Sequence, residues 1–174
     1  YVGWAFNGYA IPTTLKYVQI TDATIISANA FYGCSMIETL TLNEGTTVIH
    51  DKAFYDCSSL KNMKVPTTVA TIGSYAWYNC SEMTSIQLPK VTELNDYLLY
   101  GCSKLTQITI PGSVTKIGAY AFFDCSGIKT IQLPANLESI GNYGFSGCVE
   151  IMVLVLPNKL ETIGNYAFEN MQIT

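Results

Sequence analysis

The feature that most constrains the fold of this chain is the even spacing of its six cysteines along 174 residues. Successive cysteines are 23, 23, 22, 23 and 23 residues apart, at Cys34, Cys57, Cys80, Cys102, Cys125 and Cys148. A fixed period of this length is typical of a repeat protein, in which every repeat is one structural unit. A residue that recurs in every repeat is therefore better explained by packing than by catalysis.

A second column, of large apolar residues, stands three positions before each cysteine. These anchor residues are Phe31, Phe54, Trp77, Leu99, Phe122 and Phe145, and Phe168 extends the column with Met171 in the cysteine position. We expect the anchors to be deeply buried and stacked along the array. The cysteines lack the paired spacing of a metal site. Equivalent cysteines of stacked repeats also point the same way, which is unsuitable for disulfides, so we expect buried free thiols that act as small apolar residues.

An L-x-x-L-x-L pattern after each cysteine predicts a strand with one buried face. In one copy it is formed by Met83, Ile86 and Leu88, and the last two of these are two positions apart, which is the period of a strand. The residue between them is polar in six of seven copies, and a proline usually ends the segment because it cannot donate to the ladder. We therefore expect seven parallel strands.

A second short apolar segment precedes each anchor. The residue after it is glycine in four copies and Ser27, His50 or Asn95 in the other three, so we expect a left-handed turn there. This assigns His50, the only histidine, a role in a turn. A single helical turn should follow, ending at a second turn position occupied by Gly33, Asp56, Asn79, Gly101, Asp124 or Gly147.

Together these patterns predict a single repeat array over residues 1–174, of the α/β class and rich in β-structure. Its repeats of about 23 residues should stack in a right-handed solenoid, with a parallel sheet on the concave side and short strands and single-turn helices on the convex side. The first copy, about residues 1–25, is degenerate, copies in residues 26–171 are regular, and the last copy is truncated. No polar capping unit is visible, so we expect exposed apolar surface at the Met171 end, which would allow end-to-end self-association.

The motif I-G-x-Y-A-F-x-x-C-S-x-L-x-x-I-x-L-P, legible in the copies around Cys80 and Cys125, resembles the BspA-like branch of the leucine-rich repeat proteins. The resemblance extends over nearly the whole chain, from about residue 6 to residue 174. It implies a cell-surface or secreted protein of mucosa-dwelling bacteria or parasitic protists, often linked to adhesion. It does not imply a particular ligand.

Composition excludes several classes of function. The net charge is −4 and the nine Lys and Arg residues do not cluster, so no basic stripe for nucleic acid exists. No apolar run approaches the ~20 residues that span a bilayer, so we expect no membrane insertion. No catalytic triad, phosphate-binding loop or paired-carboxylate motif stands out. We therefore expect no enzymatic activity, no cofactor and no metal.

Two functions remain open. In the first, the chain is a non-catalytic binding module of a cell-surface or secreted adhesin and presents a polar sheet face, uncharged apart from Lys64, to a host protein or glycan. In the second, it is a structural spacer or a self-associating array element of a larger surface protein. The candidate ligand face, here called the polar face, consists of Thr39, Thr41, Asn62, Lys64, Ser85, Gln87, Gln107, Thr109, Thr130 and Gln132.

One copy departs from this polar pattern. Residues 151–156 read IMVLVL, so Met152, Val153 and Val155 stand where other copies carry polar side chains. β-Branched residues suit a strand in any case. Three together nevertheless favour a contact site, here called the apolar patch. We expect Val153 and Val155 to be exposed in the monomer and covered by a partner, a second copy or a downstream segment.

Aromatic residues form two further columns. They are Tyr75, Tyr97, Tyr120, Tyr143 and Tyr166, and Tyr32, Tyr55, Tyr78, Tyr100 and Phe123. Such columns could offer a stacking platform to a glycan or peptide, but we favour packing of each ring on its neighbours. Asn79-Cys80-Ser81 also matches an N-glycosylation sequon. The expected burial of Cys80 argues against its use.

Overall fold

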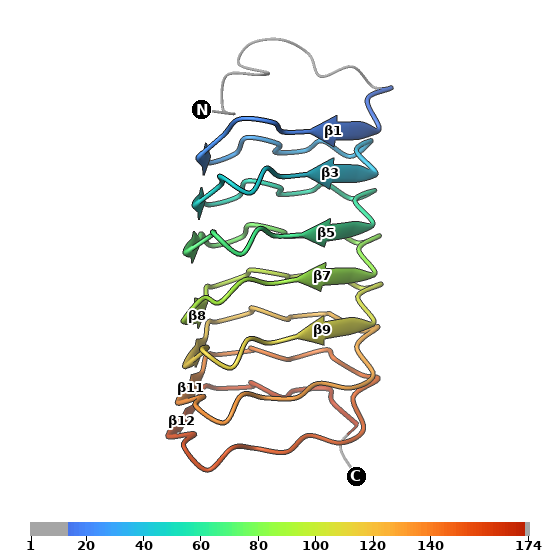
Figure 1. Cartoon of the computed structure of the whole chain (residues 1–174). Helices are drawn as coiled ribbons and strands as arrows, with labels where there is room; N and C mark the ends of the chain where they lie inside the picture. The colour runs from blue at the N-terminus through green and yellow to red at the C-terminus, as the bar shows by residue number, and fades with distance from the viewer. Residues whose placement is uncertain (1–13, 173–174) are drawn as a thin grey trace.

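The computed structural model describes residues 14–172, which form a β-solenoid of parallel coils stacked as a rod (Figure 1). One side carries a five-stranded sheet with the order β1-β3-β5-β7-β9. Its strands are β1 (Tyr17–Gln19), β3 (Thr39–Thr41), β5 (Asn62–Lys64), β7 (Ser85–Gln87) and β9 (Gln107–Thr109). All of its strand pairs are parallel, and each residue pairs with its equivalent in the next repeat, as Ser85 does with Gln107.

Shorter strands form another side of the solenoid, in the segments that precede the anchors in sequence. The first sheet contains β2 (Ile25–Ile26), β4 (Val48–Ile49) and β6 (Thr71–Ile72). The second contains β8 (Glu93–Leu94), β10 (Lys116–Ile117), β11 (Ser139–Ile140) and β12 (Thr162–Ile163). These two sheets continue to the last described repeat, whereas the five-stranded sheet ends at β9.

The predicted single-turn helix is wrong, because residues 14–172 contain no helix. Its place is taken by consecutive tight turns, as where the N–H of Cys57 donates to the carbonyl of Phe54 at 3.2 Å. The alternate N–H groups point out of the coil. The N–H of Phe54, for example, donates to the carbonyl of Ala76 in the next repeat at 2.9 Å. Since every second N–H is used between repeats, the bonds of a continuous helix cannot form.

One of the two predicted left-handed positions is confirmed. The residues just before the cysteines have φ between 54° and 79°, at Gly33, Asp56, Asn79, Gly101, Asp124 and Gly147. The other prediction is wrong, because neither Gly73 nor His50 has a positive φ, and the left-handed residue is Tyr75, with φ 59°. Glycine recurs at the position of Gly73 for a different reason. A Cβ on Gly118 would lie 2.6 Å from the backbone nitrogen of Asp96, so glycine permits close approach of neighbouring coils.

The anchor column forms the centre of the core, as predicted. All anchors from residue 31 to residue 145 are at most 1% exposed. Ring centroids are 5.5 Å apart for Phe31 and Phe54 and 4.9 Å apart for Phe122 and Phe145. Where Leu99 interrupts the aromatic column, Leu98 is also fully buried and restores part of the lost volume.

The six cysteines are buried free thiols, as predicted. Each thiol from Cys57 onward donates to the carbonyl of the anchor in the preceding repeat, with sulfur–oxygen distances of 3.1 to 3.3 Å. The column is therefore more than apolar filling. The carbonyl of Phe54, for example, accepts the backbone N–H of Cys57 in its own repeat and the thiol of Cys80 in the next, so the thiols add a second hydrogen bond to buried carbonyls and join successive coils.

The prediction of seven parallel strands on this side is wrong in number, because the sheet has five strands and stops at β9. Thr130, Gln132, Met152, Val153 and Val155 therefore lie outside strands. No backbone hydrogen bond joins residues 129–133 or 152–156 to another coil within the described chain. Apolar alternation determines which side chains enter the core, but the ladder also needs a set separation between coils, which alternation does not specify.

Candidate functional site

The polar face is built by the alternation of the five strands. In β3, β5, β7 and β9 the middle residue is buried and both flanking residues are exposed. Since the strands pair in register, the exposed side chains form two columns that run along the solenoid. One column contains Thr39, Asn62, Ser85 and Gln107, and the other contains Thr41, Lys64, Gln87 and Thr109.

A shallow groove of about 740 Å³ crosses β5, β7 and β9. Seven residues of the polar face line it, namely Asn62, Lys64, Ser85, Gln87, Gln107, Thr109 and Thr130. Thr39 and Thr41 lie on the adjacent strand β3, and Gln132 lines the next groove. The structure thus gathers most of the predicted face in one depression.

Some lining residues were not predicted from the sequence. Leu88, Pro89, Lys90 and Pro111 also line this groove. The only signal for them was the proline at the end of each strand, which we assigned to strand termination alone. The prolines therefore border the groove as well as ending the ladder.

Hydrogen bonds hold part of the polar face in place. The Asn62 amide oxygen accepts from the Ser85 hydroxyl at 2.9 Å and from the Thr84 hydroxyl at 2.8 Å. Lys64 lies 3.8 Å from Glu44, and both side chains are mostly exposed, so this pair contributes little. With Lys64 and Lys90 as the only charged groups of the groove, a ligand would be held mainly by neutral hydrogen bonds and apolar contacts.

An ion-pair cluster lies just before the strands at one end. The Glu38 carboxylate accepts from Lys16 and from Lys61, both at 2.7 Å. These two hydrogen bonds lower the pKa of Glu38 to about 2. The three residues belong to three successive repeats, so the cluster ties coils together outside the groove.

The apolar patch is exposed, as predicted. Met152, Val153 and Val155 are 65%, 69% and 75% exposed, and Leu156 beside them is 44% exposed. Apolar surface is also exposed towards the Met171 end, as expected, at Ile163.

The aromatic columns pack as expected. In one, consecutive rings from Tyr32 to Phe123 stack with centroids 4.5 to 4.8 Å apart. In the other, the rings from Tyr75 to Tyr166 stack at 4.4 to 5.0 Å. Each ring face is covered by its neighbour, and the partial burial raises the pKa of Tyr55 to about 12. A flat ligand therefore has no free ring face along the interior of either column.

Other candidate chemistry is sparse. Within residues 14–172, no three His, Cys, Asp or Glu side chains form a cluster that could hold a metal ion. The same part of the chain contains no helix of the length and hydrophobicity that a membrane span requires. At the sequon, the side-chain nitrogen of Asn79 donates to Asp56 at 2.8 Å and Cys80 is buried, so the acceptor nitrogen is already engaged.

Comparison with known proteins identifies the repeats. The sequence pattern of the family described as "BspA type Leucine rich repeat region (6 copies)" matches residues 6–126 and 92–174. This agrees with the resemblance inferred from the motif. No curated protein matches the chain.

Solved structures show the same fold. A leucine-rich repeat protein from Eubacterium ventriosum matches with a TM-score of 0.83 and 26% identity, covering 91% of this chain and 44% of that protein. A leucine-rich repeat protein of T. pallidum matches with a TM-score of 0.87 and 24% identity, covering 92% and 79%. A leucine-rich cell surface protein of Faecalibacterium prausnitzii has a TM-score of 0.59 and 21% identity, with coverage of 91% and 52%. The chain thus spans less than half of the E. ventriosum structure, and the predicted leucine-rich-repeat solenoid is confirmed.

Proposed function

The chain belongs to the BspA-type leucine-rich repeat family, and we propose that it is a non-catalytic binding module of a cell-surface or secreted protein. Its ligand, a host protein or glycan, binds to the polar face. The observation that carries this proposal is the single groove that contains seven of the ten residues of that face. The cell-surface location draws support from family resemblance, since the F. prausnitzii neighbour is described as a cell surface protein.

The chemistry of the groove indicates how such a ligand is held. Apart from Lys64 and Lys90 its hydrogen-bonding side chains are neutral, and the buried apolar residues Ile86 and Ile108 also line it. Neutral hydrogen bonds each contribute about 1 kcal/mol, so affinity must come from many contacts. Because few charges take part, binding should depend only weakly on ionic strength.

Replacing both Gln87 and Gln107 by Ala should lower the affinity for the ligand roughly 30-fold, because two hydrogen bonds of about 1 kcal/mol each are lost. The ligand would first be found with arrays of glycans and extracellular-matrix proteins, and its affinity then measured by calorimetry. The control replaces Thr71 and Thr92 by Ala, since both are exposed outside the polar face. Equal losses in the two double variants would contradict the assignment of the site.

The alternative function is a structural spacer. In that case the protein should bind nothing on the arrays, and both double variants should behave like the wild type. The regular ladder from β1 to β9 suits a spacer as well as a binding module. A ligand that binds the wild type and the Thr71 and Thr92 variant, but not the Gln87 and Gln107 variant, would favour the binding module over the spacer.

The apolar patch serves, in our proposal, as a second contact surface. Replacing Val153 by Thr and Val155 by Gln restores the polar chemistry of the other copies and should weaken self-association at least tenfold in sedimentation experiments. The expectation rests on the exposure of both valines, which burial in a contact would stabilise by ~1 kcal/mol or more per side chain. If sedimentation and ligand binding are both unchanged, the patch is not a contact site.

A further inference from the structure

The open edge of β9 is the most unusual feature of the sheet. Strands β3, β5 and β7 each have a hydrogen-bonded strand on both sides, but β9 has only β7. The next coil passes beside β9 without pairing, because none of the backbone groups of residues 129–133 forms a backbone hydrogen bond within the described chain. A row of unpaired N–H and C=O groups therefore faces the space between these coils.

The opening is confined to this side of the solenoid. On the opposite side, the N–H of Gly141 donates to Ile117 at 2.8 Å and that of Tyr120 donates to Asn142 at 2.9 Å. In the core, Phe122 and Phe145 remain stacked at 4.9 Å. The two coils are thus joined along one side and separated along the other, like a wedge.

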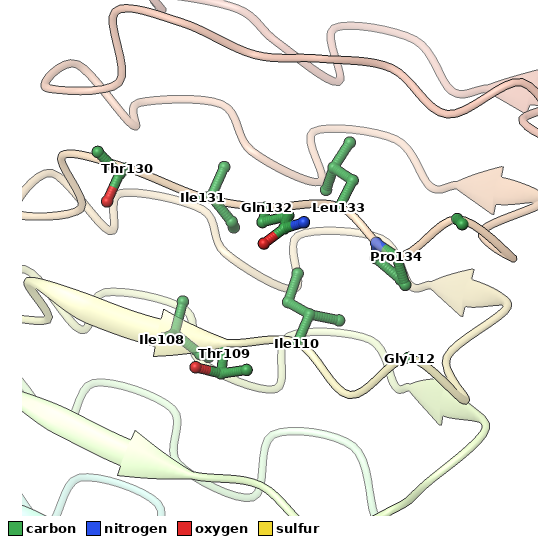
Figure 2. Close-up of a pocket in the computed structure, with 10 residues that line it drawn as sticks. Ile108, Thr109, Ile110, Gly112, Thr130, Ile131, Gln132, Leu133 and Pro134 are labelled. Atoms are coloured by element: carbon green, nitrogen blue, oxygen red, sulfur yellow. The ribbon is translucent and has the colours of Figure 1, made fainter.

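The wedge forms a groove of about 600 Å³, here called the open groove (Figure 2). Ile108, Ile110, Ile131 and Leu133 contribute apolar side chains to it, and none of its lining residues is charged. A further groove of about 540 Å³ lies on the other side of residues 130–135 and includes Val153 and Val155. Residues 130–133 therefore have open space on both sides.

We propose that the open groove binds an extended, uncharged segment of a partner polypeptide, which pairs its backbone with the free edges of β9 and residues 129–133. This rests on the proposed function as a binding module and assigns it a class of ligand. Unpaired strand edges are templates for another strand, whose main-chain bonds supply affinity and whose alternate side chains supply specificity. A glycan offers hydroxyl groups but not the alternating N–H and C=O groups that such an edge matches.

The groove also specifies the side chains of the segment. Alternate residues of a bound strand would face Ile110 and Leu133, so they should be apolar or β-branched. The remaining residues would face solvent beside Thr109 and Thr130, which also line the polar-face groove. The strands of this protein have that pattern themselves. Residues 84–89, which read TSIQLP, are an example and provide a probe.

Amide hydrogen exchange tests the open edge without any ligand. In the free protein, the amides of residues 129–133 should exchange within about tenfold of the rate of an unstructured chain, since they have no hydrogen bond. The amides of β5 and β7 should exchange at least a thousandfold more slowly. If residues 129–133 are as protected as β7, the groove is closed in solution and the proposal is wrong.

Binding is tested with an acetylated and amidated peptide of sequence TSIQLP. At saturation it should slow exchange of the amides of residues 129–133 at least tenfold. The control peptide carries N-methyl groups on its Ile and Leu nitrogens, which removes two donors while keeping the side chains, and it should have no effect. Equal slowing by both peptides, or by neither, would overturn backbone pairing.

The double variant Gln87→Ala and Gln107→Ala separates this proposal from the proposed function. It should lose the array ligand but still respond to the peptide, because neither residue lines the open groove. If the amides of residues 129–133 are protected in the free protein and the array ligand still binds, only the proposal of the open groove is refuted. If the peptide slows exchange but no ligand is found on the arrays, only the proposal that the polar face binds a ligand is refuted.

Discussion

Raising the pH above about 9 should unfold the protein steeply, because its buried thiols resist ionisation in the folded state. Burial raises the pKa of Cys102 and Cys148 to about 12 and holds the pKa of Cys80 and Cys125 well above the usual value. In an unfolded chain the same thiols have a pKa of about 8.5. Ionisation therefore favours the unfolded state.

The direction of the effect follows from proton binding in the two states. Below about pH 8.5 the thiols are protonated in both states, so their contribution to stability is complete and independent of pH. Between about pH 8.5 and pH 12 the unfolded chain releases protons that the folded chain retains. Each such thiol lowers the free energy of unfolding by about 1.4 kcal/mol per pH unit, so four thiols remove about 5 kcal/mol per unit. A total stability of about 5–15 kcal/mol would be lost within one to three pH units.

Urea unfolding at several pH values from 7 to 10.5, with a phosphine reductant present, measures this dependence. The variant Cys102→Ala removes one thiol and should reduce the slope above pH 9 by about 1.4 kcal/mol per pH unit, although it is less stable at neutral pH. A free energy of unfolding that stays constant from pH 7.5 to pH 10 would show that the thiols ionise without unfolding the protein.

The repeat columns could be predicted from the sequence because periodicity repeats the same physical environment. A residue such as Phe122 recurs at a fixed spacing and meets its equivalents above and below, so burial and stacking follow from the pattern. The free state of the thiols followed from the same argument, since equivalent side chains of parallel coils point alike. First-repeat predictions that concern residues 1–13 lie outside the described residues.

The errors arise where structure depends on neighbouring coils and not on one repeat. Gly73 was read as a turn residue, but its column is set by the close approach of adjacent backbones. The predicted helical turn failed because alternate N–H groups, such as that of Phe54, bond to the next repeat. Residues 129–133 have the buried face that was predicted but not the predicted strand pairing, because burial does not fix the separation between coils.

The candidate site was predictable in composition but not in shape. Alternation correctly placed Gln87 and Gln107 on an exposed face. It could not show that the face is hollowed, or that Leu88 and Pro89 border the hollow, because depth depends on how coils sit against one another. The open groove was missed for the same reason.

Truncating a central anchor, Phe122→Ala, should cost about 3–5 kcal/mol of stability, because the buried ring leaves a cavity that stacked coils cannot fill. The substitution keeps the Phe122 carbonyl, which accepts the Cys148 thiol hydrogen bond at 3.2 Å. The loss therefore reports on the ring and its stack with Phe145, and not on that hydrogen bond. Chemical unfolding measures it.

The neighbouring variant Phe123→Ala is the matched control, since it removes the same side chain from a half-buried position in the aromatic column. It should cost only about 1–2 kcal/mol, because less apolar area is exposed and no closed cavity forms. Hydrogen exchange should further show that Phe122→Ala weakens protection most in the coils of Leu99 and Phe145, because repeats couple mainly to their nearest neighbours. Equal losses in the two variants, or an unchanged unfolding midpoint for Phe122→Ala, would mean that the anchor column does not hold the coils together and that stability resides in the backbone ladders.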